Sequence, residues 1–285
     1  MYSPMLDLNC RSMIKRFWTL IQNLSLDITA GAVISSLYVA KVFSVLLSSN
    51  MLFGLGIAIW LIYTIDHLLD AHFASDQPKN RRHAFHQRHK NKLLILGAII
   101  FLVGLINLTY LPFTTIKFGL VLAAFVLFYF GSLHLLKISK TWHKEILAAV
   151  IYTVGVFAAP FSQMALIGAV EILFLIQFFL LVLSNLFLFP LFEFTTDCED
   201  KLQSIVTIKG KRFVRSLILV LVLMNSALIG FAVLNGQSYE ATMVLFAMNL
   251  TLFILWKWPF VFQINDRYRF LGDGIFFLPL IYLLL

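Results

Sequence analysis

Two pairs of acidic residues stand at the ends of long apolar runs, and each pair can hold a cation. Asp66 and Asp70 are four residues apart, as are Glu193 and Asp197. On a helix, residues with this spacing project from one face, with Cβ atoms roughly 6 Å apart. Both pairs fall where a helix should end, and free carbonyl groups make the potential negative there. One such pair alone is equally typical of a solvated helix end. Two pairs on one side predict a divalent-cation site suited to Mg²⁺, which binds carboxylates, water and substrate phosphates.

Basic residues near both acidic pairs are suited to a diphosphate, whose negative charge they would neutralise. The candidates are Arg81, Arg82, Lys137, Lys144 and Lys201. With the diphosphate held by metal and cations, an allylic carbon can ionise and alkylate a nearby nucleophile. The 29 Phe, 9 Tyr and 5 Trp residues can line an apolar tunnel and stabilise a carbocation through cation–π contacts.

The composition is that of a membrane protein. Hydrophobic residues make up 60% of the 285 residues, charged residues make up 13%, and the mean hydropathy is +0.90. This excludes a soluble globular domain, and a chain in lipid must satisfy its backbone within helices. Nine apolar runs are long enough to span a bilayer. They lie near 28–48, 51–70, 93–111, 115–136, 145–166, 169–193, 213–234, 239–258 and 269–285. The predicted fold class is an all-α bundle of nine transmembrane helices.

The distribution of positive charge predicts the orientation. Of the 22 Lys and Arg residues, all but Lys41 and Lys117 lie in the N-terminal tail or in loops that alternate with cation-poor turns. This accounts for the net charge of +8 without a nucleic-acid partner. The positive-inside rule places the N-terminus and both acidic pairs in the cytoplasm and the C-terminus outside. No cleavage site follows the first apolar run, so we expect no removable signal peptide and favour a bacterial inner membrane.

Two units are expected along the chain. Residues 1–27 form a cytoplasmic tail, in which an amphipathic helix around Arg11–Leu24 lies on the membrane surface. Residues 28–285 form a single nine-helix domain. Within it, helices two and six both end in an acidic pair followed by a basic loop, which indicates two repeats with the site between them.

The two acidic stretches resemble the paired aspartate-rich motifs of the UbiA superfamily of intramembrane prenyltransferases. The first family motif, N-x-x-x-D-x-x-x-D, matches at Asp66 and Asp70, and Asn80–Arg81 resembles the N-R that often follows it. The second, D-x-x-x-D, is similar to the stretch from Glu193 to Asp197. The segment from Ser204 to Gly210 resembles the S-x-x-x-x-x-G that follows the second motif. Tyr129 with Lys137, and then Lys144–Glu145–Ile146, resemble the family's segment between helices four and five.

The resemblance implies a nine-helix fold and transfer of a prenyl group from a polyprenyl diphosphate to an aromatic or other lipophilic acceptor. It also implies that Mg²⁺ is held by Asp66, Asp70, Glu193 and Asp197. The sequence departs from the family at three places and is therefore identified as a divergent member. Ile62 replaces the motif Asn and Tyr63 replaces the Asp often found beside it, Glu193 replaces an Asp, and the Arg-Pro near the start of helix one is absent.

Three other interpretations stay open. An intramembrane terpene cyclase would use the same metal and diphosphate but no acceptor. A non-catalytic member would bind or move a lipid, which the Ile62 and Glu193 changes favour. A histidine metal site, with His67, His72 and the segment His83–His89, resembles only one of the several clusters that membrane di-iron oxygenases need. A basic loop at the interface fits these histidines better.

Two further acids and one lysine are candidates for a buried polar role. Asp27 and Asp273 lie near the cytoplasmic ends of helices one and nine and can close a polar chamber. An acid at a helix N-terminus is also favoured simply by the helix dipole. Lys41 is expensive in lipid unless it faces a cavity or extends to the interface.

Overall fold

A computed structural model describes residues 17–73, 81–134, 143–200 and 203–285 of the chain. Every regular element in these ranges is helical. The first is a short helix at Phe17–Asn23. The others are α2 (Leu26–Val42), α3 (Ser49–Phe73), α4 (Arg81–Arg88), α5 (Lys90–Leu108), α6 (Phe113–His134), α7 (His143–Ser162), α8 (Ala169–Glu199), α9 (Ile205–Lys209), α10 (Lys211–Leu234), α11 (Tyr239–Lys257), α12 (Pro259–Gln263), η2 (Ile264–Asp266), α13 (Arg267–Gly274), η3 (Ile275–Phe277) and α14 (Pro279–Leu284).

The all-helical membrane class is confirmed, but nine spans are not. Within the described ranges, seven helices are long and apolar enough to cross a bilayer. An eighth crossing is possible if Phe17–Asn23 and α2, which meet at a bend of 71°, count as one span. The single helix expected at 269–285 is instead broken into α13, η3 and α14. The break has a local cause, since Pro279 has no backbone N–H to continue a helix and begins α14 in the first turn.

The expected surface helix at Arg11–Leu24 lies only partly in the described residues. Residues 1–16 lie outside them, and Phe17–Asn23 is helical as predicted. The division of the chain into a tail and one domain stays a prediction.

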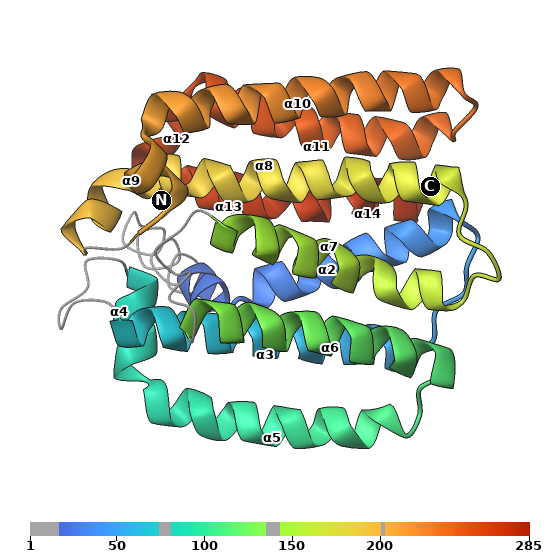
Figure 1. Cartoon of the computed structure of the whole chain (residues 1–285), viewed down its shortest axis with the longest axis horizontal. Helices are drawn as coiled ribbons and strands as arrows, with labels where there is room; N and C mark the ends of the chain where they lie inside the picture. The colour runs from blue at the N-terminus through green and yellow to red at the C-terminus, as the bar shows by residue number, and fades with distance from the viewer. Residues whose placement is uncertain (1–16, 74–80, 135–142, 201–202) are drawn as a thin grey trace, which may run out of the picture.

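The long helices lie side by side with their axes roughly aligned (Figure 1). The end of α3 that carries the first acidic pair lies at the same end of the bundle as α4, α9 and α12, and the C-terminus lies at the other end. No membrane fixes which end faces the cytoplasm, so the predicted orientation stays a prediction.

The core is formed around α7 and α8. Of their spanning segments, 61% is buried, against 11% for α5 and for α6, which turn apolar side chains outward. Phe157, Phe174 and Phe178 are almost fully buried at the centre and pack ring against ring. Lipid is as apolar as these side chains, so close packing rather than the hydrophobic effect holds such helices together. The buried pair α7 and α8 supplies a rigid wall for the site at the α4 end.

Candidate active site

A cavity of about 240 Å³ opens among α3, α4, α6, α7, α8 and α13. Its wall contains the first acidic pair, Asp66 and Asp70, and also Glu193 of the second. The fold therefore brings Asp66 and Asp70 to the same cavity as Glu193, more than 120 positions away in the sequence. The rest of the wall is largely apolar and aromatic, so the cavity has a charged part and an apolar part.

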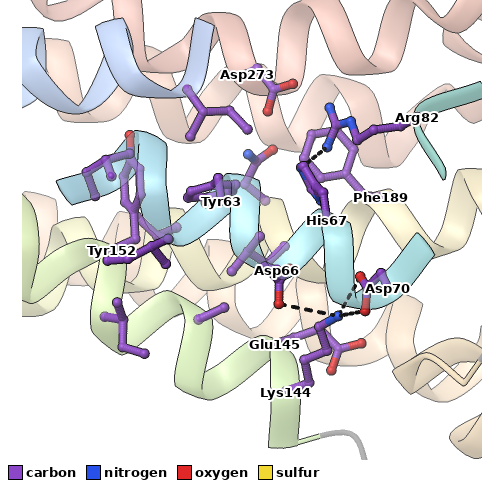
Figure 2. Close-up of a pocket in the computed structure, with 18 of the residues that line it drawn as sticks. Tyr63, Asp66, His67, Asp70, Arg82, Lys144, Glu145, Tyr152, Phe189 and Asp273 are labelled. Atoms are coloured by element: carbon purple, nitrogen blue, oxygen red, sulfur yellow. Dashed lines mark hydrogen bonds and ion pairs between the residues drawn. The ribbon is translucent and has the colours of Figure 1, made fainter. Parts of the chain in front are cut away.

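The carboxylates of Asp66 and Asp70 converge on one ammonium group, that of Lys144 (Figure 2). The Lys144 Nζ donates to both oxygens of Asp70 at 2.7 Å and lies 3.8 Å from Oδ1 of Asp66. The Tyr129 hydroxyl donates to the same Asp66 oxygen at 2.9 Å. Asp66 and Asp70 share a face of α3 because of their spacing, while Lys144 comes from the first turn of α7. The pair thus holds a cation, as two acids at a helix end require.

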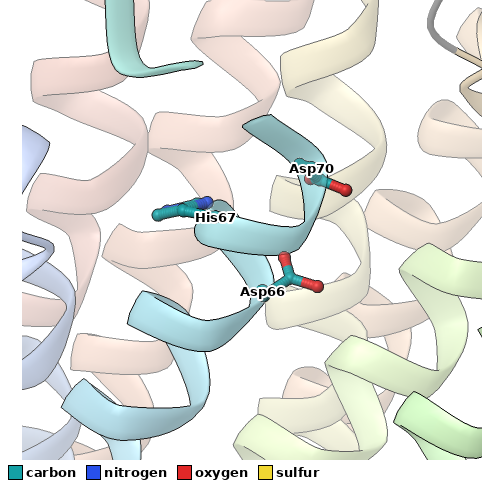
Figure 3. Close-up of side chains that lie close together, drawn as sticks. All are labelled: Asp66, His67 and Asp70. Atoms are coloured by element: carbon teal, nitrogen blue, oxygen red, sulfur yellow. The ribbon is translucent and has the colours of Figure 1, made fainter. Parts of the chain in front are cut away.

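These two carboxylates fit a divalent ion. Ligand atoms of Asp66, His67 and Asp70 lie within 4.8 Å of one another, but His67 leaves the helix in a different direction from the two acids (Figure 3). Its Nε2 lies 3.2 Å from Nη1 of Arg82. A guanidinium can only donate, so this nitrogen is occupied and the ring is neutral. The carboxylates of Asp66 and Asp70 would hold the metal once the Lys144 ammonium moves aside. Water and substrate oxygens would complete its coordination.

The second acidic pair is arranged differently. The Glu193 carboxylate is 2.8 Å from Nη2 of Arg269 and accepts a hydrogen bond from the Tyr268 hydroxyl at 3.2 Å. Tyr268 is held in place by a stacked contact with Phe192. Asp197 is buried and is absent from the cavity wall. In the described ranges, neither Glu193 nor Asp197 joins two further ligands in a metal-sized group. Their role as metal ligands stays a prediction.

Arg269 is a cavity residue that the sequence reasoning counted only as a loop cation. It lines the cavity from α13, together with Glu193 from α8. The available signal was a cation at the start of the last apolar run, on the same side as both acidic pairs. That signal locates the residue but not its partner.

The predicted diphosphate ligands are described in part. Lys144 and Arg82 line the cavity. Arg81 begins α4, but its side chain lies outside the described part, as do Lys137 and Lys201 entirely. Burial lowers the pKa of the Arg82 guanidinium, yet it stays charged because the ordinary value is so high. Of the cavity's cations, Lys144 contacts the first acidic pair, Arg82 contacts His67, and Arg269 contacts Glu193.

The histidine segment forms a support for the site. His83 and His86 are buried, and burial lowers the pKa of both. The ring of His86 packs edge to face against His67 with centroids 5.2 Å apart, and its Nδ1 lies 2.9 Å from the Arg82 carbonyl. The amide of Gln87 donates to the carbonyl of Ala71 at 2.7 Å. These contacts attach α4 to the end of α3. Among the described residues, His83, His86 and His89 form no metal-ligand group.

The apolar part of the cavity lies deeper along α3. Tyr63 and Tyr152 meet there with ring centroids 6.5 Å apart, and Ile62 lies on the same wall. Figure 2 shows the two tyrosines to one side of the acidic pair, with Asp273 above them. Asp273 lines this cavity, and Asp27 and Asp273 together line a second, largely apolar cavity. That the two acids close a polar chamber stays a prediction.

Comparison with solved structures shows the same fold in UbiA homologues. A UbiA homologue from Aeropyrum pernix K1 superposes with a TM-score of 0.63 over 92% of this chain and 99% of that chain, at 13% identity. A homologue from Archaeoglobus fulgidus, solved with DMAPP and Mg²⁺ bound, gives 0.62 over 91% and 97% at 11% identity. A third match is a structure described for digeranylgeranylglyceryl phosphate synthase, at 0.58 over 92% and 94% with 13% identity.

By sequence alone, no protein-family model and no curated protein matches the chain. The resemblance drawn from the acidic motifs is therefore confirmed at the level of the fold. The similarity of fold extends over nearly the whole length of this chain and of each matched chain.

Proposed function

We propose that this protein transfers a prenyl group from a polyprenyl diphosphate to a lipophilic acceptor within the membrane, with Mg²⁺ as the metal. One observation carries the proposal. The convergent carboxylates of Asp66 and Asp70 stand at the charged part of a cavity whose remaining wall is apolar and aromatic. A prenyl diphosphate has the same division, with a charged head and an apolar chain. The fold shared with a homologue bound to DMAPP and Mg²⁺ supports it.

Different side chains would bind the metal and the diphosphate. Asp66 and Asp70 hold the metal, and we include Glu193 and Asp197 as ligands of the second motif. When bound, Mg²⁺ neutralises charge that develops on the departing diphosphate. Arg82 and Lys144, with Arg81, Lys137 and Lys201 from the adjoining segments, contact the phosphate oxygens. This arrangement favours breaking the bond between the allylic carbon and the diphosphate oxygen.

The apolar part would shelter the resulting carbocation. The Tyr63 and Tyr152 rings line the cavity and meet each other edge to face, and an aromatic face attracts a cation. Diphosphate leaves with the electron pair of the broken bond when this carbocation forms. The allylic carbon then bonds to the acceptor nucleophile, which loses its proton to water. We place the reaction in a bacterial inner membrane with the charged part of the cavity facing the cytoplasm.

Product analysis with purified protein tests this function. Geranyl, farnesyl and geranylgeranyl diphosphates would each be supplied with Mg²⁺ or EDTA, with and without a membrane lipid extract as the source of acceptor. A prenyltransferase gives a new prenylated lipid only when extract and Mg²⁺ are both present. Cyclic hydrocarbon formed without extract would indicate a cyclase instead. No product and no diphosphate from any donor, with folded protein, would contradict both and favour a lipid-binding protein.

A further inference from the structure

A second cavity shares one lining residue with the candidate active site. It has a volume of about 450 Å³. Trp18, Asp27 and Thr251 line it from three different elements, and the remaining wall comes from the segment 270–278. Asp273 lines both this cavity and the first one. A single acidic residue therefore borders both cavities.

The carboxylates of Asp27 and Asp273 are both buried, and one oxygen of Asp27 has no hydrogen-bond partner among the described residues. Asp27 is 3% exposed, and its Oδ1 accepts from the backbone N–H of Ile28 at 3.0 Å, but its Oδ2 has no partner. Asp273 is 7% exposed, and the cations whose charges act on it, Arg82 and Arg269, line the first cavity. A buried polar atom without a partner costs about 1–3 kcal/mol, and more if it is charged. Both carboxylates are therefore suited to a ligand that donates a hydrogen bond.

The two cavities differ in the charged residues that line them. Arg82, Lys144 and Arg269 line the first cavity, whereas no basic residue in the described ranges lines the second. Apart from its two acids and Thr251, the second wall is aromatic and aliphatic. Such a space disfavours an anion, because two buried carboxylates would repel it across a medium of low dielectric constant. It suits an apolar molecule with a neutral hydroxyl group.

We propose that the second cavity binds the acceptor, and that this acceptor is a neutral, hydroxyl-bearing lipid rather than a carboxylic acid. Its hydroxyl donates to Asp273, which holds the oxygen at the junction with the first cavity, and Asp27 supplies a second acceptor atom. The inference rests on the proposed function, because it assigns the acceptor of that reaction. It makes Asp27 and Asp273 determinants of acceptor specificity.

Trp18 provides a direct readout, since its indole lines the second cavity. Purified protein in detergent, without metal or donor, would be titrated with a brominated long-chain alcohol, because bromine quenches indole fluorescence. The same brominated chain ending in a sulfonate serves as the permanently anionic probe. The signal of Trp18 is the difference between the wild type and Trp18→Phe. We expect saturable quenching by the alcohol and roughly tenfold weaker binding of the sulfonate, as one charge-assisted hydrogen bond would give.

Substitutions of the lining residues test which side chains give the preference for the alcohol over the sulfonate. Asp273→Asn keeps the shape but removes a charge, so the preference for the alcohol should fall by at least about threefold. Asp27→Asn should reduce the same preference, and it provides the test if Asp273→Asn does not fold. Gly274→Leu should weaken both probes, because Gly274 lines the cavity and a Cβ there meets no atom within 4 Å.

Three results would overturn the inference: no saturable quenching by the alcohol, equal binding of alcohol and sulfonate, or unchanged preference in both Asn variants. Diphosphate release from farnesyl diphosphate and Mg²⁺ is measured on the same wild-type sample. Release without alcohol preference overturns the acceptor site alone. Absence of release overturns the proposed function, whatever the probes show.

Discussion

Lys144 is central to the proposed metal site, because its ammonium lies where a divalent ion would bind. It contacts Asp70 at 2.7 Å and lies 3.8 Å from Asp66. We expect Lys144→Gln to bind Mn²⁺ roughly tenfold more tightly, since a competing charge-assisted contact is removed. Turnover of a prenyl diphosphate should fall about 100-fold, because the cation also stabilises the leaving group. Electron paramagnetic resonance of bound Mn²⁺ measures the first effect.

Lys117→Gln is the matched control for the loss of one positive charge. Lys117 is exposed and belongs to α6 near the opposite end of the bundle. Its substitution should leave Mn²⁺ affinity and turnover unchanged. Weaker Mn²⁺ binding in Lys144→Gln than in the wild type would contradict the competition between ammonium and metal.

Sequence spacing was enough to predict the first half of the site and not the second. Four-residue spacing places Asp66 and Asp70 on one face of α3 wherever that helix packs. Their partner Lys144 is 74 residues away from Asp70, and periodicity within one helix carries no information about which helices meet. For the same reason the contact between Glu193 and Arg269 was not predicted, although both residues were correctly placed on one side.

At the scale of elements, the close approach of α13 to α8 is set by Gly272. A Cβ at this position would lie 2.9 Å from Oδ1 of Asn185 and 3.0 Å from the ring of Phe189. We expect Gly272→Ala to lower the free energy of unfolding by about 1–3 kcal/mol through overpacking. Thermal unfolding in detergent, followed by circular dichroism, measures this change.

Gly274→Ala is the control on the same helix. A Cβ there meets nothing within 4 Å, and the residue has ordinary helical dihedral angles. Alanine is favoured over glycine in a helix by about 1 kcal/mol, so stability should be unchanged or slightly raised. Equal losses in both variants would show that α13 does not approach α8 as described.

The attachment of α4 to α3 predicts a dependence of stability on pH. Burial lowers the pKa of His86 in the folded protein, while in the unfolded chain it stays near 6.5. Below about pH 6.5 the unfolded state therefore binds the proton more readily, and stability is lost as pH falls further. We expect the unfolding temperature to drop between pH 7 and pH 5, and to drop less in His86→Gln. His72→Gln, at an exposed position, should keep the wild-type dependence. An identical dependence in all three proteins would contradict a buried neutral His86.

For the whole molecule, the two ends of the bundle should face opposite sides of the membrane. Cys198 is free and exposed near the end of α8 that carries the second acidic pair. Ala165, also exposed, lies between α7 and α8 at the opposite end of the bundle (Figure 1). In intact cells producing a Cys10→Ser background, an impermeant maleimide should label Ala165→Cys and spare Cys198. Labelling of Cys198 without permeabilisation would reverse the orientation that the positive-inside rule predicts.

The fold class was predictable at this scale because long apolar runs leave the chain few alternatives. Lipid excludes an unpaired backbone, so runs such as 213–234 must be helices, and α10 is one (Lys211–Leu234). The last crossing was predicted less well. Hydropathy averages over the segment 269–285, whereas the break before Pro279 depends on a single missing N–H.

The central claim is that Asp66 and Asp70 bind the Mg²⁺ that permits diphosphate to leave, and one measurement tests it most directly. Release of diphosphate from farnesyl and geranylgeranyl diphosphates would be compared for the wild type, Asp66→Asn, Asp70→Asn and Glu240→Gln. Glu240 is an exposed acid at the first turn of α11 and controls for loss of one carboxylate. We expect EDTA to abolish the release of diphosphate by the wild type. We expect the rate of release to fall at least about 100-fold in either Asn variant and to stay at the wild-type level in Glu240→Gln. Release that persists in EDTA, or in Asp66→Asn and Asp70→Asn, would contradict it.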